Sequence, residues 1–168
     1  MIVITGAAGF IGSNVAAELY RQGHNLLLVD DFSREDKQPN LAELKLQNRM
    51  DRMEFLDWLS VHGKSVDFVI HLGARTDTTE FNTAIFDELN LNYSKAVWNA
   101  CVEFNIPLVY ASSAATYGSG EHGYTDSHEI LDQLVPLNPY GVSKNEFDKW
   151  AIAQASQPPV WTGLKFFN

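Results

Sequence analysis

The stretch MIVITGAAGFIG, residues 1–12, decides the fold of this chain. Its apolar run at residues 2–4 predicts a buried strand, and residues 10–21 have the pattern of an amphipathic helix. The turn between them carries three glycines in the spacing G-x-x-G-x-x-G, namely Gly6, Gly9 and Gly12. A strand, a glycine turn and a helix in this order are typical of a dinucleotide site. Glycines let the backbone approach the pyrophosphate, and the helix start offers free N–H groups and partial positive charge.

Short apolar runs alternate with helical patterns along the rest of the chain. This alternation predicts an α/β fold, a doubly wound and mostly parallel Rossmann sheet with helices on both faces. We expect strands at residues 2–4, 25–30, 44–47, 65–71, 106–112 and 160–167. We expect helices at residues 10–21 and 51–59, a long helix ending near 105, and a last helix at 139–155. Residues 32–40 and 118–138 are predicted loops, and the second is long enough to form a wall of a site.

Length, charge and cysteine content exclude several classes of protein. The 168 residues, 45% of them hydrophobic, suit one dinucleotide-binding domain, 1–168. A net charge of −9 argues against a nucleic-acid surface, and no apolar run reaches the roughly 18 residues of a membrane span. No secretory signal is visible, and the single Cys101 excludes an internal disulfide, so we expect a cytoplasmic protein. The five histidines lack metal-ligand spacing, so we expect no metal.

Two further segments are candidates for cofactor binding. Asp30 and Asp31 end the second predicted strand, where an acid accepts hydrogen bonds from an adenosine ribose; a turn or capping Asp is the alternative. Residues 72–76 follow the fourth predicted strand and should line the ligand crevice: Leu72, Gly73, Ala74, Arg75 and Thr76. Asn90, on the long helix, either reaches back to that crevice or lies on the surface.

The candidate catalytic residues are a tyrosine, a lysine and a serine. Tyr140 and Lys144 are four residues apart, which places both side chains on one face of a helix. A cation beside a tyrosine favours the phenolate and brings its pKa toward the range useful for a general base. Ser113 ends the fifth predicted strand, where its hydroxyl can bind the alcohol or ketone that is interconverted. A surface pair on a helix is the structural alternative for the tyrosine and lysine.

Together these motifs resemble the extended short-chain dehydrogenase/reductase family, which includes nucleotide-sugar epimerases and dehydratases. Shorter matches at residues 50–52, 78–80, 92–95, 110–118 and 166–168 are similar to its ADP-heptose 6-epimerase subfamily. That resemblance implies inversion at C6 of ADP-D-glycero-β-D-manno-heptose by transient oxidation with bound NADP, for lipopolysaccharide core synthesis. It also implies a nucleotide-sugar substrate and a full-length protein that forms homo-oligomers.

The resemblance also assigns roles to single residues. Phe10 and Ile11 would lie against the cofactor, and Lys37 and Arg52 would lie near the 2′-phosphate of NADP. NAD is the alternative cofactor, because carboxylates at residues 30 and 31 repel a 2′-phosphate. Residues 72–76 and Asn90 would line the nicotinamide side. The catalytic set would be Ser113, Tyr140 and Lys144, with Ser113 and Asn168 contacting the substrate.

The chain departs from the family pattern at Leu72 and Arg75, and it ends at Asn168. Family members continue into a second general base and a substrate domain, so these residues alone should bind a dinucleotide but epimerise poorly. The alternatives are a UDP-hexose 4-epimerase, a dTDP-glucose 4,6-dehydratase and a dinucleotide-binding module without catalysis. Residues 114–116, Ala-Ala-Thr, disfavour dehydration, since dehydratases carry an acid pair there. Tyr140 and Lys144 disfavour the non-catalytic module.

Overall fold

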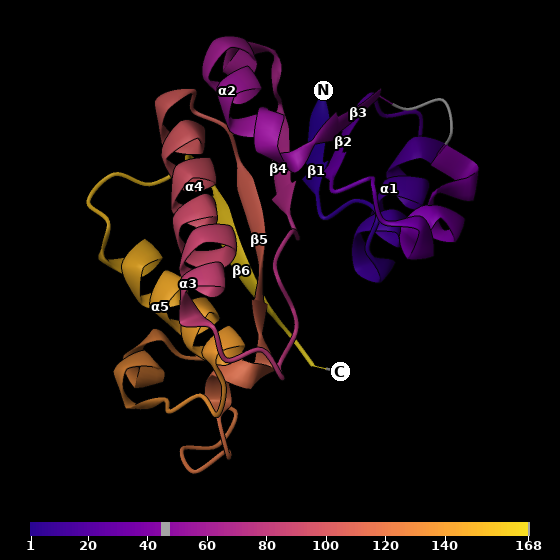
Figure 1. Ribbon diagram of the computed structural model, residues 1–168. Helices are drawn as coiled ribbons and strands as arrows, with labels where there is room; N and C mark the ends of the chain where they lie inside the picture. Colours follow the sequence, from indigo (N-terminus) through magenta and orange to yellow (C-terminus); the bar gives the residue numbers. More distant parts are fainter. Residues whose placement is uncertain (45–47, 168) are drawn as a thin grey trace.

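A parallel six-stranded sheet forms the centre of the protein, as a computed structural model of residues 1–44 and 48–167 shows (Figure 1). Its strands run in the order β3-β2-β1-β4-β5-β6. They are β1 (Ile2–Thr5), β2 (Leu26–Asp30), β3 (Asn48–Asp51), β4 (Phe68–His71), β5 (Leu108–Ser113) and β6 (Trp161–Phe166). The chain turns outward on both sides of β1, toward β2 on one side and β4 on the other. Such a switch point opens a ligand crevice at the carboxyl ends of the strands.

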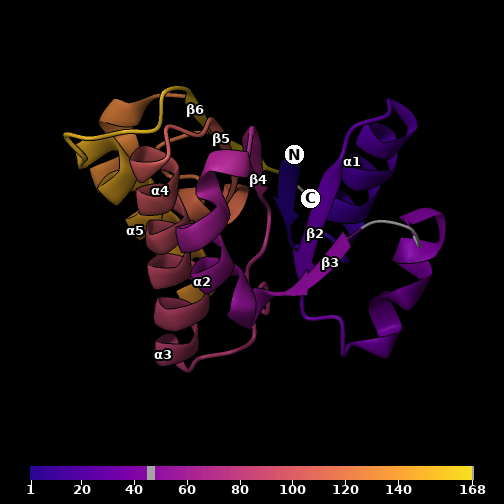
Figure 2. The same cartoon turned by 90° about the horizontal axis from the view of Figure 1, so that it is seen from above.

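Helices cover both faces of this sheet, which confirms the doubly wound α/β fold. The α-helices are α1 (Phe10–Arg21), α2 (Arg52–His62), α3 (Thr83–Phe86), α4 (Tyr93–Glu103) and α5 (Pro139–Ala153). The other helical turns are η1 (Glu35–Leu44), η2 (Gly63–Ser65), η3 (Asp87–Asn92), η4 (Ala114–Tyr117) and η5 (His128–Gln133). Figure 2 shows α1 on one side of the sheet and α2, α4 and α5 on the other.

The buried strand β2 explains how the sequence builds two cores. Leu27 and Val29 pack with α2, α4 and α5, whereas Leu26 and Leu28 pack with α1 and η1. All five residues of β2 are buried, as expected of a parallel strand covered on both faces. Trp98 of α4 is the largest fully buried side chain of the first core. The carboxyl ends of the strands therefore belong to a sheet that is packed on both faces.

The third strand is not where the sequence predicts it. We expected a strand at residues 44–47, but Leu44 is buried in η1 and residues 45–47 lie outside the described part of the chain. The observed β3 begins at Asn48 and pairs with β2 through backbone hydrogen bonds. Three of its four residues are polar and none is buried, so this edge strand has little apolar pattern from which it could be predicted. The predicted loop at 32–40 is likewise partly helical, because Leu41 and Leu44 of η1 pack against α1.

Other predicted boundaries differ by a few residues. The long helix begins at Thr83, contains the π-helical turn η3 and ends at Glu103, short of residue 105. Asn105 follows with a φ of 55°, a left-handed conformation that ends the helix. The predicted loop 118–138 contains the short helix η5, which buries Leu131. The strands β4, β5 and β6 each begin one to three residues later than predicted.

The start of α5, which carries the Tyr-x-x-x-Lys pair, depends on a capping asparagine. The Asn138 side chain accepts a hydrogen bond of 2.8 Å from the Gly141 N–H, and Pro139 occupies the first turn. Replacing Asn138 by Ala should lower the free energy of unfolding by about 1 kcal/mol, which urea denaturation would measure. Asn82→Ala is the matched control, since the Asn82 side chain accepts a longer hydrogen bond, 3.2 Å from the Ala84 N–H, at an exposed helix start and should matter less. Equal losses in the two variants would contradict this ranking.

Candidate active site

A cleft of about 450 Å³ lies at the carboxyl ends of β1, β4 and β5. Most predicted site residues line it: Gly6, Gly9, Phe10, Ile11, Gly12, Asp30, Lys37, Arg52, Leu72, Gly73, Ala74, Thr76, Ser113, Tyr140 and Lys144. Asp31, Arg75 and Asn90 are outside this lining, and Asn168 lies outside the described residues. Motifs more than 130 residues apart in the chain therefore share one cavity.

The glycine turn is held in a conformation that leaves no room for side chains. Gly6 has a φ of 69°, and a Cβ there would lie 2.7 Å from the Gly73 nitrogen. A Cβ on Gly12 would lie 2.1 Å from the Gly6 carbonyl oxygen. In the described part of the chain no side chain caps the start of α1, and its first turn has no acidic residue. The open helix start therefore suits an anion such as a pyrophosphate.

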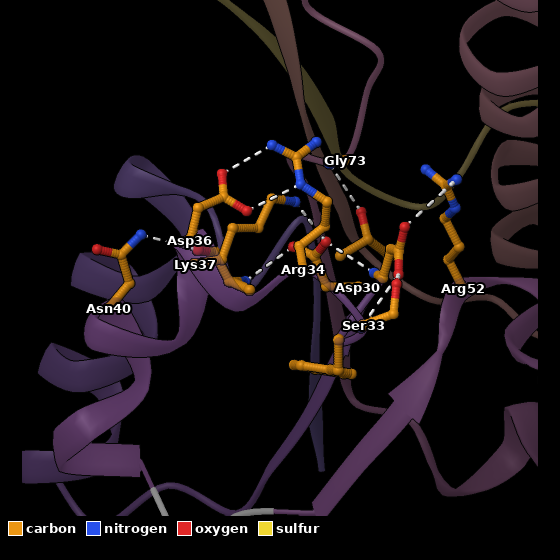
Figure 3. A network of polar contacts seen from close by, with 12 residues as sticks. Asp30, Ser33, Arg34, Asp36, Lys37, Asn40, Arg52 and Gly73 are labelled. Atoms are coloured by element: carbon orange, nitrogen blue, oxygen red, sulfur yellow. Dashed lines mark hydrogen bonds and ion pairs between the residues drawn. The ribbon is translucent and has the colours of Figure 1, made fainter.

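Asp30 is largely occupied by the protein itself (Figure 3). Its Oδ2 accepts a 2.8 Å hydrogen bond from the Ala8 N–H of the glycine turn. Its Oδ1 accepts hydrogen bonds from the Asp31 N–H at 2.7 Å and the Lys37 Nζ at 2.8 Å. The side chain of Asn40 donates to the Ala8 carbonyl at 2.9 Å, so η1 also holds this turn. Asp30 thus holds the glycine turn in place, at the strand end where the sequence predicted a ribose contact.

Two cations offset the carboxylates at this end of the cleft. Asp31 accepts hydrogen bonds from the Ser33 hydroxyl and N–H, which lower the pKa of its carboxyl group. The Arg52 guanidinium lies 4.0 Å from Asp31, and Lys37 pairs with Asp30. In Figure 3 Arg52 and Lys37 lie on opposite sides of Asp30. The local charge is therefore close to balanced, despite two adjacent acids.

Ser113, Tyr140 and Lys144 converge on the cleft from β5 and α5. Ser113 ends β5, and its Oγ accepts a hydrogen bond of 3.1 Å from the Ala115 N–H. Lys144 is buried, and its Nζ donates to the Ala111 carbonyl at 2.8 Å. Burial lowers the pKa of Lys144 to about 8, although the nearby Asp148 carboxylate acts in the opposite direction. The lysine therefore titrates close to neutral pH.

The pKa of the Tyr140 phenol is shifted in the direction opposite to the one expected from the sequence. Burial raises its pKa, and a hydrogen bond with Ser113 opposes this rise without cancelling it. The Tyr-x-x-x-Lys spacing predicted a pKa below the usual value, and the direction in the structure is the reverse. The reason is that the ring is more than half buried, while the Lys144 ammonium is directed at the Ala111 carbonyl. Tyr140 is accordingly a hydrogen-bond donor at neutral pH.

Asn90 positions the loop after β4 instead of lining the cleft. Its Oδ1 accepts a 2.7 Å hydrogen bond from the Arg75 N–H, and its Nδ2 donates to the Arg75 carbonyl at 3.0 Å. The same Nδ2 donates to the Ser143 Oγ of α5 at 3.0 Å. The Arg75 guanidinium turns to Asp77 at 3.1 Å. Asn90 thus joins the residue 72–76 loop to the helix that carries Tyr140 and Lys144.

Several residues of the site had not been predicted from the sequence. The cleft is also lined by Thr5, Val29, Met53, Thr78, Leu89, Tyr93, Ala111, Ser112 and Phe166. Thr5, Val29, Ser112 and Phe166 lie at or near strand ends, a position that could have indicated them. Thr5 shares a 2.6 Å hydrogen bond with buried His71 and accepts another from the Gly73 N–H. Burial lowers the pKa of His71 to about 3, so this histidine is neutral and structural.

Residues 1–44 and 48–167 show no feature of a metal centre or of a membrane-spanning helix. Among these residues no three or more His, Cys, Asp or Glu side chains lie close enough together to hold a metal ion. No helix in the same ranges has the length and apolar character needed to cross a membrane. Cys101 is buried in the core, and burial raises the pKa of its thiol to about 12, so it is unreactive.

Two curated relatives resemble the whole chain. A protein of Fusobacterium nucleatum subsp. nucleatum named ADP-L-glycero-D-manno-heptose-6-epimerase is 44% identical, over 100% of this chain and 52% of the relative. A protein of that name from Nitratidesulfovibrio vulgaris is 38% identical, over 100% of this chain and 53% of the relative. The chain therefore spans about half the length of the curated relatives it matches.

Solved structures agree with these relatives. The crystal structure of Helicobacter pylori ADP-L-glycero-D-manno-heptose-6-epimerase superposes with a TM-score of 0.81 at 28% identity, over 99% of this chain and 54% of that chain. MoeE5, solved in complex with UDP-glucose and NAD, gives a TM-score of 0.74 at 26% identity, over the same shares. These matches confirm the resemblance predicted from the motifs. A model of the NAD dependent epimerase/dehydratase family matches residues 2–168, and the chain belongs to that family.

Proposed function

We propose that this chain is the dinucleotide-binding and catalytic part of an ADP-heptose 6-epimerase. One observation carries the proposal: a single cleft joins the open glycine turn to Ser113, Tyr140 and Lys144. The names of the relatives from Fusobacterium nucleatum and Helicobacter pylori support the substrate, ADP-D-glycero-β-D-manno-heptose. A dinucleotide-binding module without catalysis would not need a tyrosine, a serine and a buried lysine in its cleft.

The residues of the cleft suit a transient oxidation at C6 of the sugar. A bound nicotinamide would supply the chemistry of accepting a hydride and returning it. In this proposal Tyr140 takes the proton of the sugar hydroxyl and Ser113 holds its oxygen, which the position of both residues in the cleft supports. The phenol must ionise to accept that proton, and Lys144, one turn away, is the cation that favours the phenolate. Lys144 is also placed to donate to the ribose hydroxyls.

NADP is the cofactor that we propose, and NAD is the alternative. The proposal rests on Lys37 and Arg52, which line the cleft beside Asp30 and Asp31. Without these cations, two carboxylates would repel a 2′-phosphate. Charge-assisted hydrogen bonds from a lysine and an arginine can instead bind it.

We propose further that the chain is half of a longer enzyme, with the substrate domain and the second general base beyond residue 168. The relatives are about twice as long, and Leu164 on β6 is 41% exposed although it lies in the sheet. The longer enzyme would act in the cytoplasm as a homo-oligomer, without nucleic-acid or membrane partners. Asn168 would contact the nucleotide sugar there.

A fluorescence titration of the chain with NADP and NAD tests the dinucleotide proposal, with Trp150 and Trp161 as reporters. Saturable binding that is tighter for NADP is the expected result. A preference for NAD would favour a UDP-hexose 4-epimerase, and no binding of either dinucleotide would contradict the proposal. For the full-length enzyme, NMR of the product would show whether C6 of ADP-D-glycero-β-D-manno-heptose is inverted.

The two cations near the aspartates give a sharper test. Lys37→Ala and Arg52→Ala should each weaken NADP binding by about tenfold, because each loses a charged contact to the 2′-phosphate. Binding of NAD, which lacks that phosphate, should change much less. Arg34→Ala is the matched control, since Arg34 lies in the same segment but pairs with exposed Asp36 (Figure 3). An equal loss of NAD and NADP affinity in the first two variants would contradict the assigned contacts.

A further inference from the structure

A buried carboxylate lies directly behind the proposed catalytic residues. Asp148 of α5 is only 4% exposed and lies one helical turn beyond Lys144. Its Oδ1 accepts a 3.0 Å hydrogen bond from the Tyr110 hydroxyl. Its Oδ2 accepts hydrogen bonds from the Ser112 Oγ at 2.6 Å and the Lys165 Nζ at 2.9 Å. A buried charge of this kind is costly, and here it is fully surrounded by donors.

The partners of Asp148 belong to the elements that form the cleft. Ser112 lines the cleft and precedes Ser113 on β5. Lys165 precedes Phe166, another residue of the lining, on β6. The Lys165 Nζ also donates to the Thr116 Oγ1 of η4 at 2.7 Å. Asp148 therefore joins α5 to β5, β6 and η4 immediately beneath the site.

The hydrogen bonds alone do not explain why this group is charged. An amide oxygen would accept equally well from the hydroxyls of Tyr110 and Ser112. The groups that a negative charge at this position stabilises, and a neutral amide would not, are the ammonium groups of Lys165 and Lys144. Lys144 is buried, and burial disfavours its ammonium form unless an anion is near. Asp148 is the acid one turn away on the same helix face.

We propose that Asp148 is a positioning residue that keeps the Lys144 ammonium protonated, while Lys165 limits the strength of this effect. The role of that proton in binding a dinucleotide rests on the function proposed above. The effect of Asp148 on the protonation of Lys144 is independent of that proposed function.

The other groups that face Lys144 do not provide this charge. His71 on β4 is neutral, because burial lowers its pKa to about 3. Asn90 of η3 is neutral, and Tyr140 on α5 carries a phenol whose pKa is raised by burial. Lys165 on β6 is a cation that pairs with Asp148 at 2.9 Å and so offsets part of its negative charge. With a pKa of about 8, Lys144 is protonated at pH 7 and loses its proton as the pH rises through that value.

The test is a pair of substitutions with opposite expected signs. Asp148→Asn keeps the acceptor for the hydroxyls but removes the negative charge, so the proton affinity of Lys144 should fall by about tenfold. Lys165→Gln keeps a donor to Asp148 but removes the positive charge, so the proton affinity of Lys144 should rise. NMR titration of the lysine Cε resonances in ¹³C-lysine-labelled chain, without any ligand, measures both. Lys144→Arg assigns the resonance.

A surface acid provides the control. Asp132 of η5 is 91% exposed and lies 3.8 Å from Lys149, so Asp132→Asn should leave the Lys144 titration unchanged. Shifts of the same sign in Asp148→Asn and Lys165→Gln, or no shift in either, would overturn the proposal. Should Asp148→Asn fail to fold, the double variant Asp148→Asn/Lys165→Gln replaces it, because this variant leaves neither charge of the ion pair without its partner. The proton affinity of Lys144 should still be lowered in the double variant.

A second measurement separates this inference from the proposed function. In the unchanged chain, NADP affinity should fall as the pH rises through about 8, because Lys144 loses its proton. In Asp148→Asn that fall should begin at a pH lower by about one unit. If the NMR titrations shift as expected and NADP affinity does not follow, Asp148 has the role inferred here. The proposed contact of Lys144 with the dinucleotide would then be wrong.

Discussion

Replacing Tyr140 by Phe should lower the proposed epimerase activity of the full-length enzyme by about 10²–10⁴-fold, the usual contribution of a general acid or base. The substitution removes one oxygen atom, the phenol oxygen that hydrogen-bonds with Ser113. The aromatic ring is retained and still fills its partly buried position beside Ser113 at the end of β5. The loss should therefore appear in kcat, measured by NMR detection of the C6 epimer.

The affinity for NADP shows whether the substitution removes only the catalytic hydroxyl or also disrupts the structure of the site. In Tyr140→Phe it should change by only a few-fold, since Lys144 and the glycine turn remain. Tyr20→Phe is the control, because Tyr20 of α1 packs against the core around Leu26 and Leu28 and is not among the residues that line the cleft, so the loss of its hydroxyl should leave kcat unchanged. Activity of Tyr140→Phe within tenfold of the unchanged enzyme would instead favour a dinucleotide-binding module in which Tyr140 has no chemical role.

The parts of the site that the sequence predicted are those set by local spacing. The glycine turn, the strand-end Ser113 and the pair Tyr140 and Lys144 each lie within one short motif, and all line the cleft. Their placement in one cavity follows from a parallel sheet, since all strands end at the same edge. A sequence with a clear α/β alternation therefore predicts both the fold and the centre of the site.

The remaining features depend on contacts between distant segments. Asp30 was correctly placed at a strand end, but its oxygens bind Ala8 and Lys37, which no local pattern indicates. The direction of the Tyr140 pKa depends on burial, which spacing along a helix does not contain. Asp148 had no motif of its own, and its partner Lys165 is 17 residues away. The strand β3 was misplaced because a polar edge strand is stabilised by its backbone partner, β2.

The glycine turn offers the second large effect, through Gly12→Ala. A methyl group at this position would lie 2.1 Å from the Gly6 carbonyl oxygen, so one backbone segment must move. Such overpacking should lower the free energy of unfolding by about 1–3 kcal/mol, measured in urea. The same movement would displace the N–H groups proposed to bind a pyrophosphate. We therefore expect dinucleotide affinity to fall by about 100-fold, since each lost hydrogen bond to a charged group costs about 1.5–3 kcal/mol.

Gly23→Ala separates the two consequences, because it is the same substitution at the other end of α1. Gly23 has a φ of 84°, but nothing lies within 4 Å of an added Cβ. It should therefore lower the free energy of unfolding by about 1–2 kcal/mol through backbone strain alone. Dinucleotide affinity should stay unchanged, because the N–H groups of the turn do not move. Equal losses of dinucleotide affinity in Gly12→Ala and Gly23→Ala would mean that general destabilisation causes the loss. The close approach of Gly12 to Gly6 would then not determine the shape of the proposed pyrophosphate site.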